Sequence, residues 1–152
     1  MTIESSIEEK ITIRPFQVKD CQALSSLYNQ LGYPVDSKTL HQRLTKLLLH
    51  DDYYLLVAVV AGQPVGFIGF ARMYMFEADE GYIRILALVV DEHFRRQGIA
   101  TSLLEGVKKF AIENEIKALA LNSGISTERS GAHTFYESTG FLKTSFGYKC
   151  SL

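Results

Sequence analysis

One stretch of the sequence, Gly81 to Val90, is nearly all apolar from Ile85 onward and leads directly into a charged turn. A run that is apolar on both faces is typical of a central strand in a sheet. After Gly98 the apolar residues recur at helical spacing instead. They are Ile99, Leu103, Leu104, Val107, Phe110 and Ala111. A buried strand followed at once by an amphipathic helix predicts a sheet with helices on its faces.

The rest of the pattern extends this fold. Alternating or β-branched runs predict further strands at Ile11 to Arg14, Tyr53 to Val60, Val65 to Met75, Ala118 to Leu121 and, as one or two closing strands, Phe141 to Lys149. Helical spacing predicts helices at Asp20 to Leu31, from about Ser37 to Leu48, and at Arg129 to Ser138. We therefore expect an α/β (α+β) chain with a mixed central sheet of six to seven strands and about four helices. We expect residues 1–10 to be a disordered lead-in and residues 11–152 to form a single domain.

Composition excludes several classes of protein. The chain has 152 residues and a formal net charge of -1, whereas nucleic-acid binders usually carry a basic excess. Its two cysteines form no CxxC pair, and its four histidines, His41, His50, His93 and His133, lack ligand spacing, so no metal site is expected. The N-terminus lacks the layout of a signal peptide, and no apolar run is long enough for a membrane helix. We expect a cytoplasmic protein.

The turn after the apolar strand reads Arg95-Arg96-Gln97-Gly98-Ile99-Ala100. A helix start presents unpaired N–H groups and the positive end of the helix dipole, which together favour an anion. Gly98 permits unusual backbone angles, and the two arginines add positive charge. The turn matches neither GxxxxGK[ST] nor GxGxxG. It predicts a pyrophosphate site, and the alternative is a solvated basic turn that begins a helix.

Three separate segments together resemble the GNAT N-acetyltransferase superfamily. The first is Arg95-x-x-Gly98-x-Ala100 after an apolar strand, and the second is Asn122 at the end of the next predicted strand. The third is Ala132 to Phe141, which contains the pattern AxxFYxxxGF. The resemblance covers the chain from Ile11 onward. It implies the GNAT fold, with two strands that splay apart to open a slot for acetyl-CoA.

The resemblance also implies the residues that bind coenzyme A. The backbone of Leu88, Val89 and Val90 is expected to pair with the pantetheine arm, and an N–H group there to polarise the thioester carbonyl. The turn is expected to hold the pyrophosphate. Its residues are Arg95, Arg96, Gln97, Gly98, Ile99, Ala100 and Thr101. Asn122 either bonds the cofactor arm or caps the end of its strand.

Tyr136 matches the family's general acid, which protonates the departing thiolate, and is also expected to touch the cofactor. The alternative is a core aromatic on a helix face. Leu86 occupies the position at which many relatives carry a glutamate base, and a leucine cannot take a proton. The remaining candidate bases are Glu77, Asp79 and Glu80 in the acidic cluster Glu77 to Glu80, and of these we choose Glu80. This cluster is alternatively a solvated loop, and an ordered water chain is another route for the proton.

These residues predict an acetyl-CoA-dependent N-acetyltransferase in which a primary amine of a small molecule attacks the thioester directly. The tyrosine-rich loops around Tyr33 and Tyr74 are expected to line the acceptor side. The alternatives are a protein N-terminal or lysine acetyltransferase and a non-catalytic acetyl-CoA sensor. No nucleic acid or membrane is expected as a partner. A homodimer through the late residues around Phe146 and Tyr148 is a further hypothesis.

Overall fold

The computed structural model describes residues 10–123 and 130–152, so most of the expected lead-in, residues 1–9, lies outside the described residues. The strands are β1 (Ile11–Pro15), β2 (Tyr53–Val60), β3 (Gln63–Met73), β4 (Tyr82–Val90) and β5 (Leu119–Leu121). The helices are α1 (Cys21–Leu31), α2 (Ser37–Leu48), α3 (Ile99–Glu113) and α4 (Ser130–Ser138). Two short 3-10 helices, η1 (Val18–Asp20) and η2 (Glu92–Phe94), precede α1 and α3.

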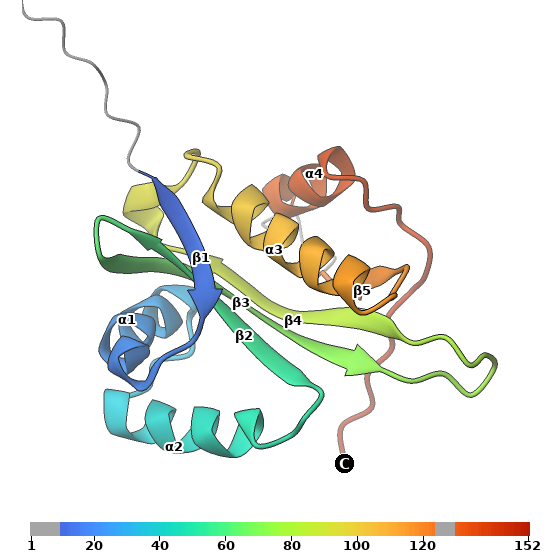
Figure 1. Cartoon of the computed structure of the whole chain (residues 1–152), viewed down its shortest axis with the longest axis horizontal. Helices are drawn as coiled ribbons and strands as arrows, with labels where there is room; N and C mark the ends of the chain where they lie inside the picture. Colours follow the sequence, from blue (N-terminus) through green and yellow to red (C-terminus); the bar gives the residue numbers. More distant parts are fainter. Residues whose placement is uncertain (1–9, 124–129) are drawn as a thin grey trace, which may run out of the picture.

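The strands form one mixed sheet in the order β1-β2-β3-β4-β5 (Figure 1). Neighbours from β1 to β4 are antiparallel, and β5 runs parallel to β4. The parallel pair needs a crossover connection, which α3 supplies. The mixed sheet and the four α-helices confirm the predicted fold class.

The prediction of six to seven strands was wrong, because the described residues form a five-stranded sheet. The missing elements are the closing strands expected within Phe141 to Lys149, which the structure shows as coil. The apolar side chains of this segment, including Leu142, Phe146 and Tyr148, are exposed. Phe141 packs against the core, but beyond it burial of apolar side chains contributes little to hold the segment as a strand. The residues alternate like a strand, but the pattern does not reveal that a packing surface is absent.

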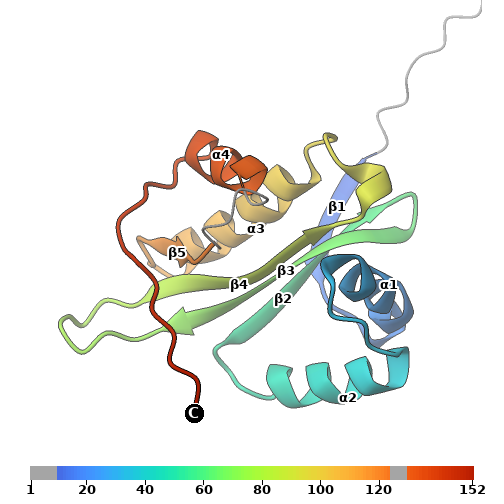
Figure 2. The same ribbon diagram turned by 180° about the vertical axis from the view of Figure 1, so that it is seen from behind.

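The two faces of the sheet carry separate cores, and helices cover both (Figures 1 and 2). On one face, α3 buries Ile99, Leu103, Leu104 and Val107 against strand residues such as Ile68 and Phe70. On the other face, Leu24, Leu27, Leu40 and Leu44 of α1 and α2 pack on Leu55, Val57 and Phe67. Alternate residues of β2 face opposite sides, which is why Leu55 and Ala58 belong to different cores.

The start of α1 is tied to β1 by a buried ion pair. Arg14 donates two hydrogen bonds to Asp20, of 2.7 Å and 2.8 Å, and the N–H of Gln17 donates to the same carboxylate at 2.8 Å. Burial raises the pKa of Asp20, but the hydrogen bonds from Arg14 and Gln17 outweigh it, so the pKa is lowered overall. The pair fixes the direction in which α1 leaves β1.

Candidate active site

One edge of β4 is open along its second half. β5 pairs with β4 at only three positions, Ile83, Arg84 and Ile85. Beyond Ile85, none of the described residues forms a strand beside β4 on that side. Figure 2 shows the short strand β5 beside one end of the longer strand β4. β4 therefore continues beyond the end of β5, and the splayed pair of strands stays a prediction.

A bulge in β4 marks the point where its pairing with β5 ends. Phe70 of β3 pairs with Ile85 and Gly69 pairs with Ala87, so Leu86 is an extra residue in β4. The side chains of Ile83 and Ile85 belong to the α3 side of the sheet before the bulge, and those of Leu88 and Val90 after it. The bulge thus changes which residues face which side, and it bends the strand.

The backbone of the open edge can be assigned from its neighbours. The N–H of Ile83 donates to Ala118 at 3.0 Å, toward β5, and the N–H of Asp91 donates to Val65 at 2.8 Å, toward β3. Because successive N–H groups of a strand point to opposite edges, those of Leu88 and Val90 point to the open edge. Two of the three predicted strand residues therefore present amides where an extended ligand could pair, and Val89 is buried.

The turn from β4 to α3 ends in a helix start with no side-chain cap. Gly98 is the N-cap residue with φ of 79°, and within the described part of the chain no side-chain cap hydrogen bond forms at the start of α3. A Cβ at Gly98 would meet nothing within 4 Å, so its glycine serves the backbone angle and leaves open space in front of the helix. Arg96 also has a positive φ, of 63°. Uncapped amides at a helix start form an anion site.

The remaining residues of the predicted pyrophosphate loop divide by exposure. The exposed ones are Arg95, Arg96, Gln97 and Thr101. Ile99 is buried in the core and Ala100 is half-buried, so these two offer their backbone to the loop. At Gly66, an added Cβ would lie 2.9 Å from the carbonyl oxygen of Val89 and 3.3 Å from Ile99 Cγ2. The absence of a Cβ at Gly66 of β3 therefore lets the start of α3 pack closely on β3, beside the end of β4.

Gln30 of α1 holds the same turn from the other side. Its side-chain oxygen accepts the N–H of Glu92 at 2.9 Å, and its amide nitrogen donates to Asp91 at 3.4 Å. Asp91 also accepts the N–H of His93 at 3.0 Å. These bonds link α1 to residues more than sixty positions later in the chain. The sequence analysis missed Gln30, and no local signal in the sequence could have found it.

Tyr136 and Asn122 come later in the chain than the open edge of β4. Tyr136 is half-buried on α4, with its ring 5.6 Å from that of Phe135 and 5.9 Å from that of Phe141. Asn122 directly follows β5 and is exposed. A Cβ added at Gly147 would lie 3.8 Å from Asn122 Nδ2, so the C-terminal segment passes beside this residue. Both predicted roles stay predictions.

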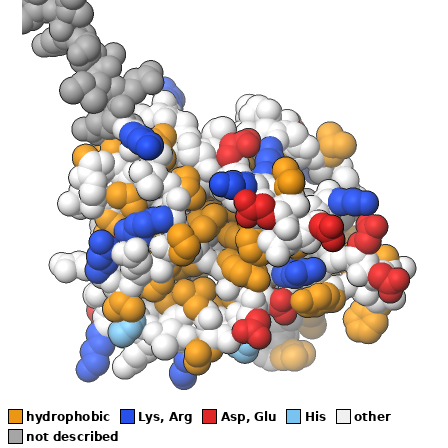
Figure 3. All heavy atoms as spheres, viewed as in Figure 1, with side chains coloured by type: hydrophobic (Ala, Val, Ile, Leu, Met, Phe, Trp, Pro, Cys, Tyr) orange, Lys and Arg blue, Asp and Glu red, His pale blue; other side chains and the backbone are white. Residues whose placement is uncertain are grey.

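Glu80 lies at the opposite end of β4 from the turn. It is exposed, and Lys117 Nζ lies 3.9 Å from its carboxylate. A strand rises about 3.3 Å per residue, so Leu86 is roughly 13 Å from Tyr82, and Glu80 precedes Tyr82. Figure 3 shows acidic side chains gathered at the end of the molecule where the β3–β4 loop lies. Glu80 as the base stays a prediction that requires this loop to come nearer to Leu86.

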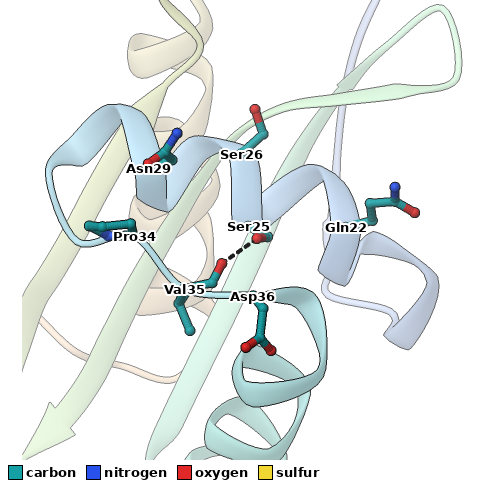
Figure 4. Close-up of a pocket in the computed structure, with 7 residues that line it drawn as sticks. All are labelled: Gln22, Ser25, Ser26, Asn29, Pro34, Val35 and Asp36. Carbon is teal, nitrogen blue, oxygen red and sulfur yellow. Dashed lines mark hydrogen bonds between the residues drawn. The ribbon is translucent and has the colours of Figure 1, made fainter.

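Two hollows lie on the α1 and α2 side. An open depression of about 570 Å³ runs along the outer face of α1, lined by polar residues such as Ser25, Ser26 and Asn29 (Figure 4). Ser25 donates to the carbonyl of Val35 across it. A smaller cavity of about 70 Å³ lies at the bulge, lined mainly by apolar side chains that include Leu86 and Ala87. Only the smaller one touches β4.

The loops expected to line the acceptor side do not contribute to the cavity at the bulge. Tyr33, Tyr74 and Phe76 are exposed, and none of them lines the cavity at the bulge. Tyr74 donates to Asp52 at 2.9 Å, and this bond raises the pKa of Tyr74. The sequence analysis missed the residues that do line the cavity, because they come from α1, α2 and three strands.

The described residues hold neither a membrane-spanning helix nor a cluster of metal ligands. None of their helices has the length and apolar character needed to cross a membrane. Within the same residues, no group of three or more His, Cys, Asp or Glu side chains is placed to hold a metal ion.

The open edge and the uncapped helix start define a class of protein that binds an extended ligand carrying phosphate. The sequence model of the Acetyltransferase (GNAT) family matches residues 20–141. The chain belongs to this family. A GNAT family acetyltransferase from Staphylococcus aureus, a solved structure, is 32% identical with a TM-score of 0.81, covering 93% of this chain and 98% of that one.

Two further relatives extend the comparison. N-acetylaspartate synthetase of Danio rerio is 36% identical over 87 residues, which are 57% of this chain and 29% of that protein. The chain thus spans less than a third of that relative. An aminoglycoside N-acetyltransferase solved in complex with CoA has a TM-score of 0.80 at 17% identity, over 95% of each chain, which shows the shared fold.

Proposed function

We propose that this protein transfers the acetyl group of acetyl-CoA to the primary amine of a small molecule. The observation that carries the proposal is the continuity of the site. The open amides of Leu88 and Val90 lead along one edge to the uncapped start of α3 at Gly98. A thioester arm that ends in a pyrophosphate fits such an edge, because amides pair with the arm and the helix start binds the anion.

The backbone supplies most of the donor site. The amides around Gly98 would hold the pyrophosphate, and the exposed side chains of Arg95 and Arg96 would add charge-assisted hydrogen bonds of about 1.5–3 kcal/mol each. The N–H of Val90 would pair with the arm. The N–H of Leu88 would bond the thioester carbonyl, whose oxygen gains negative charge as the amine attacks.

Tyr136 is the proposed acid. In the step we propose, the amine nitrogen forms a bond to the acetyl carbon, the carbon–sulfur bond breaks, and Tyr136 gives its hydroxyl proton to the sulfur. The phenol then regains a proton from solvent, and the amine's own proton leaves through Glu80 or through a chain of water molecules. Asn122 lies after β5 and would bond the arm from the other side of the slot.

Proton removal from the amine does not involve Leu86. Its side chain is 49% exposed at the bulge, where a carboxylate would otherwise face the attacking nitrogen. Glu80 remains the proposed base, which requires the β3–β4 loop to move toward Leu86. A chain of water molecules is the other route for the proton. Either route must overcome an amine pKa of about 10.4 for a lysine-like acceptor.

Relatives support a small acceptor. One family member that this chain resembles is named for N-acetylaspartate, and solved proteins with this fold are named as aminoglycoside acetyltransferases. These names concern a small molecule in each case. A peptide N-terminus or a lysine side chain is the alternative within the same chemistry.

The test is acetyl-CoA turnover measured as free-thiol release with a panel of amines. The panel contains aspartate, putrescine, an aminoglycoside, isobutylamine and a short peptide with a free N-terminus. We expect thiol release that depends on one of the small amines, with a matching acetylated product by mass spectrometry. Release with the peptide alone would replace the small-molecule acceptor. Calorimetric binding of acetyl-CoA without release from any amine would support a sensor, for which Leu86 is the structural argument.

A further inference from the structure

The cavity of about 70 Å³ at the bulge of β4 has no role in the donor site. We infer that it is the specificity subsite for the acceptor and takes a short branched aliphatic group attached close to the reacting amine. The inference rests on the proposed function and names the class of acceptor. The position, the size and the polarity of the cavity each support this class of acceptor.

The position places the cavity beside the proposed reaction centre. Leu86 and Ala87 line it, and Leu88, whose amide points to the open edge, follows directly. Two residues of strand span about 7 Å, so a group in the cavity lies within a few bonds of a nitrogen at the thioester. Leu47 and Leu86 both line the cavity and are 38% and 49% exposed, so it opens to solvent on their side.

The size follows from two small residues that face each other. Gly69 of β3 pairs with Ala87 of β4 directly after the bulge, and both line the cavity. The larger side chains around them, among them Tyr28, Tyr53 and Phe67, leave the space unfilled. An apolar cavity of about 150 Å³ takes up benzene. One of about 70 Å³ suits a group the size of an isopropyl.

The polarity excludes a second ammonium group. Among the described residues that line the cavity, none is charged, and the polar groups are tyrosine hydroxyls. Burial raises the pKa of Tyr28, so its hydroxyl stays protonated at neutral pH. A second ammonium inside would lose its hydration without gaining an opposite charge, and Arg43, whose charge acts on Tyr28, would repel it further. Aliphatic amines therefore fit this subsite better than diamines.

A methyl group added at Gly69 tests the subsite without disturbing the fold. A Cβ there would lie 3.9 Å from Leu55 Cδ1 and 4.0 Å from Ala87 Cβ, which are ordinary contacts, and its φ is not in the left-handed region. Gly69→Ala should therefore fold and fill part of the cavity. Gly131→Ala is the matched control, because a Cβ on this α4 residue meets nothing within 4 Å.

The kinetic measurement compares kcat/KM for isobutylamine, methylamine, ethanolamine and putrescine. We expect the unmodified protein to prefer isobutylamine by at least about tenfold, since one methylene in an apolar pocket is worth roughly 10- to 200-fold. Gly69→Ala should lower kcat/KM for isobutylamine by on the order of tenfold, leave methylamine unchanged and match the Gly131→Ala control for methylamine. Turnover that favours putrescine, or equal losses for both amines, would overturn the subsite while leaving acetyl transfer intact.

A binding measurement keeps the test independent of turnover. Isobutylamine is titrated into methyl-labelled protein, and the leucine methyl signals are followed by NMR. Shifts at Leu47 and Leu86 that disappear in Gly69→Ala would support the subsite even if none of the amines were acetylated. Absence of these shifts at saturating amine, or identical shifts in the variant, would overturn it.

Discussion

Along its open edge β4 presents backbone amides, whereas on the face toward α1 and α2 it presents the side chains around the cavity. The proposed donor site therefore depends on strand direction, a bulge and a helix start, which many sequences can form. The proposed acceptor site depends on which side chains stand at Gly69, Leu86 and Ala87. This difference explains why the donor could be predicted from the sequence while the acceptor could not.

The largest effect is expected for α1, because this helix supports both the donor turn and the cavity. α1 contributes Gln30 to the donor turn and Tyr28 to the cavity, and the pair Arg14–Asp20 anchors its start. Asp20→Asn removes the negative charge opposite Arg14 and one of its two acceptor oxygens, and should lower the free energy of unfolding by about 3 kcal/mol. Chemical denaturation at pH 7 measures this free energy of unfolding. Asp36→Asn is the control, because asparagine caps a helix as well as aspartate does. Equal losses in both variants would contradict the anchoring role.

The same pair predicts a pH dependence. The folded-state pKa of Asp20 lies below its unfolded value, which is near 3.9. Its contribution is therefore complete above about pH 4 and is lost as the pH falls through the folded value. Unfolding free energies measured from pH 5 to pH 3 should fall more steeply for the unmodified protein than for Asp20→Asn. Parallel curves would contradict this.

The next effect separates chemistry from binding on the donor side. Tyr136→Phe keeps the ring that contacts Phe135 and Phe141 but removes the hydroxyl. We expect kcat to fall on the order of 10²-fold with little change in the KM for acetyl-CoA. Steady-state kinetics with the best amine measures both. Tyr148→Phe, on an exposed tyrosine, should change neither constant. Unchanged turnover in Tyr136→Phe would remove this residue from the mechanism.

A smaller effect tests whether the backbone holds the donor. Gly98 and Gly62 have nearly equal φ angles, of 79° and 78°, and a Cβ meets nothing within 4 Å at either. Alanine at each should cost a similar 1–2 kcal/mol of backbone strain. Only Gly98→Ala should weaken coenzyme A binding, by roughly tenfold if the strain is relieved by a shift of the turn. Isothermal titration gives the affinity, and equal affinities in both variants would refute the backbone site.

The smallest effect concerns the contact between α1 and the donor turn, which Gln30 makes. Gln30→Leu removes the hydrogen bonds to Glu92 and Asp91 and should raise the Kd for coenzyme A about fivefold, the equivalent of one net hydrogen bond. The same titration measures it. Gln22→Leu, on the exposed face of α1, should have no effect. If Gln30→Leu instead altered only the choice of amine, Gln30 would belong to the acceptor side.

The sequence predicted the elements whose signal is local. The stripe from Ile99 to Ala111 and the apolar run before Val90 are visible because burial repeats along the chain. The closing strands failed because Phe146 and Tyr148 alternate without a surface to pack on. The bulge at Leu86 shows no alternation that marks its extra residue, and Gln30 meets Asp91 only through the folded chain. Local periodicity in the sequence does not reveal such a bulge or such a contact between distant residues.

The bulge at Leu86 also has a meaning for how such a protein changes over time. Odd-numbered residues of β4 face α3 before the bulge, and even-numbered residues face it after the bulge. Leu86 and Ala87, at the bulge, line the cavity, whereas the amides of the open edge belong to the residues that follow. Mutations at these positions alter the cavity and leave the hydrogen-bonding pattern of the edge unchanged. Descendants of one ancestor could thus acquire new amine acceptors one substitution at a time while inheriting the same donor.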